Sequence, residues 1–168
     1  LHGRFYEQTA RGKVFHVSNQ AAVSTTAGLA TTFTGLAVAN PAGSGFNMTL
    51  LFVGVAQHAV GVASAVGVMS GAGAAAGALS ARNGLVGGGS SAMSAPSAAA
   101  TIATPILERV FGSLGSVATT AYGLTPGVTW FADGSLIVPP GYFLASYTSA
   151  ATTTATIWTF VWEETPIL

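Results

Sequence analysis

Residues 132–148, ADGSLIVPPGYFLASYT, contain two apolar runs and two different turn signals. Asp133-Gly134 is a dipeptide typical of two-residue β-hairpin turns, so it predicts a hairpin between the runs on either side. Pro139 and Pro140 have no backbone N–H group, and therefore cannot lie inside a central sheet ladder. They predict the end of one strand, and Gly141 predicts the corner at which the chain turns into the next.

Other strand-like runs lie on both sides of this stretch. They are rich in Val, Thr and aromatic residues, and Gly, Pro and Asn separate them. Residues 31–39 and 46–58, linked by NPAGSG, predict a second hairpin, and the later strand is apolar on both faces, as in the middle of a sheet. Two further runs, 60–69 and 152–164, bring the total to about seven to nine short strands. The pattern predicts an all-β fold, a jelly-roll-like β-sandwich.

Two segments break this pattern. Residues 70–103 are almost entirely Gly, Ala and Ser, and predict a long loop with little core of its own. Residues 104–115 predict one short helix, because Thr104 can cap it, Pro105 suits the first helical position, and the apolar residues recur at helical spacing. The length of 168 residues suits one domain, which we place at residues 18–168.

Residues 1–17 predict an N-terminal arm. They carry four of the ten charged residues of the chain, interleaved with aromatic side chains. This composition favours docking on another subunit or another protein, although a solvated terminus is an equal alternative. The candidate contact residues are Arg4, Phe5, Tyr6, Arg11, Lys13 and Phe15. The small residues of segment 70–103 also allow close approach to another backbone, which makes that segment a second candidate.

The charge of the chain is unusually low. Asp, Glu, Lys and Arg make up 6% of the residues, where about 25% is typical. Five basic residues balance five acidic ones, so no net field attracts nucleic acid or anionic lipid. A surface with so little charge suits burial in interfaces or in a membrane. The apolar run 48–68 could span a bilayer by length, but Gln57 and His58 near its centre and its three glycines favour strands instead.

No constellation of catalytic residues is evident. The three histidines, His2, His16 and His58, are scattered, and the chain has no cysteine. Glu163 and Glu164 are neighbours on a predicted strand and therefore point to opposite faces, where they cannot share one ion. We interpret them as solvating groups or as an intersubunit pair. The sequence predicts no catalytic, cofactor or metal site, and a protein that is not an enzyme.

The aromatic residues leave two interpretations open. Trp130, Tyr142, Trp158 and Trp162 lie in apolar strands, which favours packing in the core or at a subunit interface. In the last of these strands, alternation places Trp158, Phe160 and Trp162 on one face. On an exposed sheet face the same rings could stack on sugars, as in a carbohydrate-binding module.

Three blocks of the chain resemble small virion structural proteins of tailed bacteriophages. They are HGRFYEQTARGKVF, ANPAGSGFNMTLLFV and ADGSLIVPPGYFLASYTSAATTTATIWTFVWEE. More loosely, the chain is similar to the jelly-roll decoration and cement proteins that sit as trimers on capsids. The resemblance implies a non-enzymatic decoration protein on the capsid surface, a homotrimer whose partner is the major capsid protein. A carbohydrate-binding module of a phage fibre or spike is one alternative, and a small membrane protein is another.

Overall fold

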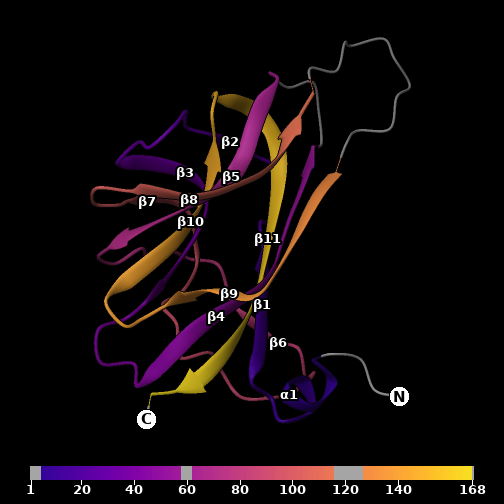
Figure 1. Cartoon of the computed structure of the whole chain (residues 1–168), viewed down its shortest axis with the longest axis vertical. Coiled ribbons are helices and arrows are strands. Elements are labelled where there is room, and N and C mark those ends of the chain that lie inside the picture. Colours follow the sequence, from indigo (N-terminus) through magenta and orange to yellow (C-terminus); the bar gives the residue numbers. More distant parts are fainter. Residues whose placement is uncertain (1–4, 58–61, 116–126, 168) are drawn as a thin grey trace.

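Two antiparallel sheets pack face to face in the computed structural model, which describes residues 5–57, 62–115 and 127–167 (Figure 1). Sheet A has the strand order β6-β1-β11-β4-β9, with β2 paired to β11 beside this path, and sheet B has the order β7-β3-β10-β5-β8. The strands of sheet A are β1 (Val14–Ser18), β2 (Val23–Thr25), β4 (Phe46–Gln57), β6 (Arg82–Asn83), β9 (Gly127–Val138) and β11 (Thr152–Pro166). Those of sheet B are β3 (Thr32–Asn40), β5 (Ser64–Ala72), β7 (Ser97–Thr101), β8 (Ile106–Leu114) and β10 (Tyr142–Thr148). The predicted all-β sandwich is confirmed.

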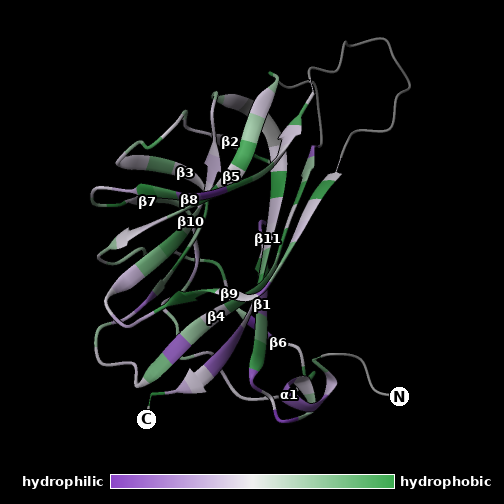
Figure 2. Cartoon of the chain, in the orientation of Figure 1, coloured by the Kyte–Doolittle hydropathy of each residue, from purple (hydrophilic) through white to green (hydrophobic). Residues whose placement is uncertain are grey.

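The main core lies between the two sheets. Strand alternation turns Trp158, Phe160 and Trp162 of β11 toward sheet B, and all three side chains are fully buried. Leu36 and Leu144 meet them from sheet B. A second apolar cluster lies on the other face of sheet B, where segments outside the sheet cover it with residues such as Ala75 and Ile102. Figure 2 shows hydrophilic residues around α1 and at the C-terminal end of β11.

The corner predicted at Pro139-Pro140-Gly141 is confirmed. Strand β9 ends at Val138 in sheet A, and β10 begins at Tyr142 in sheet B. Gly141 has a φ of 86°, a left-handed conformation that suits glycine, and its N–H group donates to Asn40 O at 2.8 Å. The chain therefore passes from one sheet to the other where proline ends the ladder.

The hairpin turn predicted at Asp133-Gly134 is wrong. Both halves of β9 pair with the single strand β4, so the dipeptide lies in a large bulge inside β9. Leu50 of β4 pairs with Leu136, and Phe52 pairs with Phe131, so two steps along β4 face five along β9. Asp133 and Gly134 have φ values of 51° and 83°. The left-handed conformation that this dipeptide favours therefore bends the strand and does not reverse its direction.

The second predicted hairpin is also wrong. Strands β3 and β4 belong to different sheets, and the NPAGSG link crosses between the sheets. The Asn40 side chain fixes this crossing, because its Nδ2 donates to Phe46 O at 2.8 Å and to Val138 O at 2.9 Å.

Strand β4 lies inside sheet A, between β11 and β9, as predicted. A register shift, and not burial of both faces alone, explains why its apolar residues do not alternate. Its register shifts between Leu50 and Phe52 against both neighbours. Met48 and Leu50 before the shift, and Val53 and Val55 after it, therefore all belong to the same core cluster.

The helix predicted over residues 104–115 is wrong. Residues 106–114 form β8, which pairs with β5 along most of its length. Thr104 has a φ of 34° and does not cap a helix. Long-range pairing with β5 outweighs the local capping signal. Within the described ranges the one helix is α1 (Tyr6–Ala10), too short to cross a membrane.

The predicted long loop and N-terminal arm are both tied into the sandwich. Segment 70–103 includes the end of β5 and all of β6 and β7, so it is only partly irregular. The predicted boundary after residue 17 falls inside β1, which pairs with β11 and β6. Among the described residues of the arm, those outside the sheets form α1, its N-cap Phe5 and the link to β1.

Candidate contact site at one end of the sandwich

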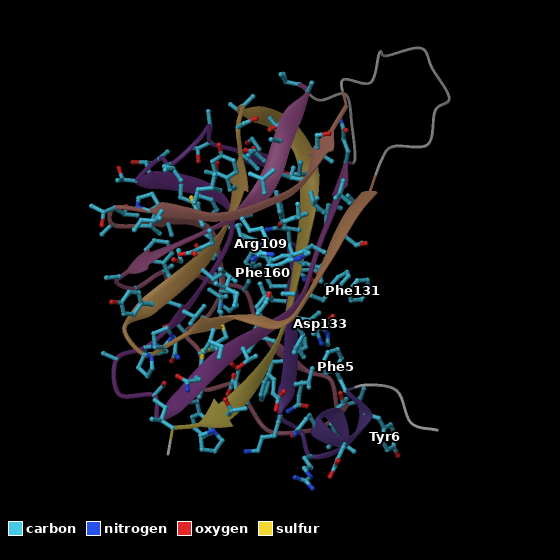
Figure 3. The ribbon with its side chains drawn as sticks, in the orientation of Figure 1. Phe5, Tyr6, Arg109, Phe131, Asp133 and Phe160 are labelled. Carbon is cyan, nitrogen blue, oxygen red and sulfur yellow. The ribbon has the colours of Figure 1, made fainter. Side chains whose placement is uncertain are left out.

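The first side of the candidate site is α1 and the start of β1. Helix α1 ends at Ala10, with Arg11 as its C-cap residue. Gly12, with a φ of 67°, then turns the chain into β1, and Lys13 N donates to Gln8 O at 2.9 Å. Arg11 pairs with Glu7 one helical turn away, at 2.5 Å, and both side chains are exposed. Tyr6 is 54% exposed and points away from the sandwich in Figure 3.

The second side is the glycine-rich loop 84–90. Asn83 organises it: its Nδ2 donates to Gly12 O and to Gly89 O, both at 3.0 Å, and its Oδ1 accepts from Leu85 N at 2.9 Å. Gly88 N donates to Leu85 O at 2.8 Å, which closes a tight turn with Val86 at its tip. Val86 is 96% exposed. A large apolar side chain is thus presented to solvent on a hydrogen-bonded turn.

A pocket of about 370 Å³ separates the two sides. Its wall includes Arg11 and Lys13 from the first side and Leu85 from the second. The Lys13 Nζ atom lies 5.6 Å from the centre of the Phe46 ring, a cation–π contact that holds the ammonium group over the pocket. A second hollow of about 460 Å³, lined by His16, Arg82 and the loop, adjoins it and shares Gly88, Gly89 and Ser90.

Glu164 forms part of the pocket floor, and it is 4% exposed. Its carboxylate accepts hydrogen bonds from Ser91 Oγ, from Ala92 N at 2.9 Å and from Trp162 Nε1 at 3.1 Å. It therefore ties segment 91–92 to β11. Glu163 and Glu164 do point to opposite faces, as predicted, but the interpretation of Glu164 as a solvating or intersubunit group is wrong. Burial raises the pKa of Glu163, on the other face, above its ordinary value.

The structure separates the six predicted contact residues. Tyr6, Arg11 and Lys13 gather at this end, Phe5 is half-buried beside α1, and Arg4 lies outside the described residues. Phe15 does not belong to the exposed set, because it is 4% exposed and stacks against Trp162 at 6.3 Å between ring centres. Strand alternation on β1 turns it into the core.

Sequence reasoning missed Leu85 and Val86. The available signal was an apolar pair inside a run of glycines, a place where no core is built. We name the exposed side chains of Tyr6, Arg11, Leu85 and Val86, together with the half-buried side chain of Lys13, the basal surface. It joins the two segments, 1–17 and 70–103, that the sequence predicted separately as contact regions.

Most of the aromatic residues considered for sugar stacking are buried or covered by other side chains. Trp158 and Trp162 are fully buried. Trp130 is half-buried, with the Phe111 ring stacked on it at 5.7 Å and the Arg109 guanidinium 5.2 Å from its centre. Tyr142 is the only one of the four that is largely exposed. A platform of several free rings is therefore not formed by these residues.

Other predicted chemistry adds little. His2 and His58 lie outside the described residues, and His16 lies on β1 opposite Arg82. No group of three or more His, Asp or Glu side chains in the described part of the chain converges as metal ligands would.

Comparison with known proteins gives no relative. The chain matches no protein-family model, and no curated protein and no solved structure is significantly similar to it. The resemblance to tailed-phage virion proteins therefore stays a prediction from the sequence.

Proposed function

We propose that the protein is a non-enzymatic structural subunit of a tailed-phage virion that binds the capsid surface as a decoration or cement protein. In this proposal the basal surface contacts the major capsid protein. Copies of the chain also contact one another, and the resemblance implies a trimer. The low charge of the chain supports this role, because a surface covered by other subunits needs little charge for solubility.

The observation that carries the proposal is the exposure of Val86 at the tip of its turn. Burying such a side chain in a partner contributes about 1.5–3 kcal/mol. The turn is already held by the Asn83 side chain, so binding would order little additional chain. Arg11 and Tyr6, at the same end of the sandwich, are side-chain types that often dominate protein interfaces.

The experiment is co-sedimentation of the purified protein with capsids that lack it. We expect Val86→Asp to weaken binding at least about tenfold, since it removes an apolar anchor and adds a charge. Val62→Asp is the matched control, because Val62 is also a largely exposed valine and does not belong to the basal surface. Equal binding of both variants and the wild type would contradict the proposed contact.

Deletion of residues 1–17 is not a suitable test. It would remove most of β1, and with it the buried side chains of Val14, Phe15 and Val17. Loss of binding by the deleted protein would report unfolding. Single substitutions on the basal surface leave the core intact.

A further inference from the structure

Strand β8 is an edge of sheet B with an unusual surface. Among the described residues its one ladder partner is β5. Ile106, Leu107 and Val110 are 64%, 38% and 48% exposed, and Glu108 and Arg109 between them are exposed as well. A long edge strand with exposed apolar side chains is a template for pairing with another chain.

Two irregularities change which way the side chains of β8 point. Against β5, Leu107 pairs with Met69, Arg109 with Val68 and Val110 with Gly67, so Glu108 is an inserted residue. Phe111 is inserted in the same way, between Val110 and Gly112. The strand therefore does not alternate regularly between the two faces of the sheet.

The contacts define the inner face of β8, which looks toward β9. The Arg109 guanidinium and the Phe111 ring both lie on Trp130 of β9. Glu108 accepts a hydrogen bond from Ser70 Oγ and lines a groove with residues 136–138 of β9 and with Pro139. These three side chains therefore share the inner face.

The register with β5 shows on which face the remaining side chains of β8 lie. Met69 belongs to the apolar cluster on the outer face of sheet B, so its partner Leu107 is on the outer face. Val110 pairs with Gly67, two residues from Met69, and is on the outer face as well. Ile106 pairs with Ser70 and is on the inner face. From residue 106 to 111 the order is inner, outer, inner, inner, outer, inner, which is the same in both directions.

We propose that β8 pairs antiparallel with β8 of a second copy of this chain, about a two-fold axis between Glu108 and Arg109. The rotation places Glu108 opposite the partner's Arg109, Leu107 opposite the partner's Val110, and Ile106 opposite the partner's Phe111, each pair occurring twice. Charges meet opposite charges, apolar groups meet apolar groups, and each pair shares a face. A regular strand alternates at every residue and cannot match this order, which makes a second copy the fitting partner.

The other edges are less suited to pairing. Strand β9, one edge of sheet A, is interrupted by the bulge at Asp133, a feature that protects edges from association. Strands β6 and β2 of that sheet have only two and three residues. Strand β7, the opposite edge of sheet B, has the sequence SAAAT and offers no large side chain. The β8 pairing does not depend on the virion role. It is two-fold, whereas the trimer implied by the resemblance would use other contacts.

Charge reversal with mixing tests the pairing. In Glu108→Arg and in Arg109→Glu, like charges face each other across the axis, and we expect the dimer dissociation constant to rise at least about tenfold. A mixture of the two single variants restores opposite charges, so it should form a heterodimer near wild-type affinity. The measurement is sedimentation velocity over a concentration series, with circular dichroism to verify folding.

Recovery in the mixture separates the proposal from a local effect, since Arg109 also contacts Trp130 within its own chain. Val86→Asp, on the basal surface, is the control that should leave dimerisation unchanged. A monomeric wild type at all concentrations, or two single variants that do not recover on mixing, would overturn the proposal.

Cysteine cross-linking tests the register. The wild-type chain has no cysteine. In an oxidised mixture of Leu107→Cys and Val110→Cys chains, a disulfide can therefore form only where these introduced residues meet. Directly opposed residues are about 4.5–5.5 Å apart at Cα, within the range of disulfides. Two copies of residue 107 are about 10 Å apart along the strands, beyond disulfide reach. We expect disulfide dimers in the mixture and not in either variant alone; dimers in the single variants alone would refute this register.

Discussion

The buried carboxylate of Glu164 should make a large contribution to stability, and Glu164→Gln tests it. The substitution keeps the size of the side chain but replaces one acceptor oxygen with an NH₂ donor. At least one of the three donors that Glu164 satisfies, Ser91 Oγ, Ala92 N and Trp162 Nε1, then loses its acceptor. A buried donor without a partner costs about 1–3 kcal/mol. We expect the free energy of unfolding to fall by about this amount, and by more in Glu164→Ala, which removes both acceptor oxygens and leaves all three donors without them.

The assay is equilibrium unfolding in urea, followed by the fluorescence of the three tryptophans, of which Trp158 and Trp162 are buried in the core. The adjacent residue provides the matched control. Glu163 is on the opposite face of β11 and burial raises its pKa, so Glu163→Gln removes an unfavourable charge and should not destabilise the protein at pH 7. If both substitutions change the free energy of unfolding equally, the role assigned to Glu164 is refuted.

Three further predictions concern Glu163, Gly67 and Phe15. Because the pKa of Glu163 is raised in the folded state, the native protein binds more protons there than the unfolded chain does, and stability falls as the pH rises from the unfolded-state value through the folded one. The advantage of Glu163→Gln over the wild type in urea should therefore be present at pH 7 and absent at about pH 3.5, below the unfolded value; an advantage independent of pH would contradict this. Gly67→Ala places a Cβ atom 2.2 Å from Arg109 O, so β5 and β8 must move apart. Calorimetry should show that the free energy of unfolding falls by about 1–3 kcal/mol; an unchanged value would contradict this close contact. Phe15→Ala should lower the free energy of unfolding in urea by about 3–5 kcal/mol. An unchanged unfolding midpoint would contradict the burial of Phe15 in the core.

Several features could be predicted from the sequence because their causes are local. Proline at 139 and 140 lacks the N–H group that a ladder needs, so the strand had to end there. Alternation placed Trp158, Phe160 and Trp162 on one face, and a face with three large rings is buried wherever the strand pairs. The neighbouring carboxylates of Glu163 and Glu164 pointed apart for the same reason.

The failures involve partners that are distant in sequence. Thr104 and Pro105 give a helix-start signal, but residues 106–114 pair with β5 along most of their length, and the local signal cannot offset those hydrogen bonds. Asp133-Gly134 favours left-handed backbone, and that preference serves a bulge as well as a hairpin. The dipeptide does not specify whether the next residues return to the same partner strand. Both outcomes depend on which strand lies alongside.

The sequence by itself determined the all-β class, the corner at Gly141 and the aromatic face of β11, because period-two patterning and the geometry of Pro and Gly act over a few residues. Only the tertiary structure decided that β3 and β4 belong to different sheets, that Glu164 is buried, and that the basal surface unites Tyr6 with Val86. That surface depends on pairing between residues far apart along the chain, as where His16 meets Arg82. Such pairing is chosen by the total burial and hydrogen bonding of the whole sandwich, a quantity that no local stretch contains.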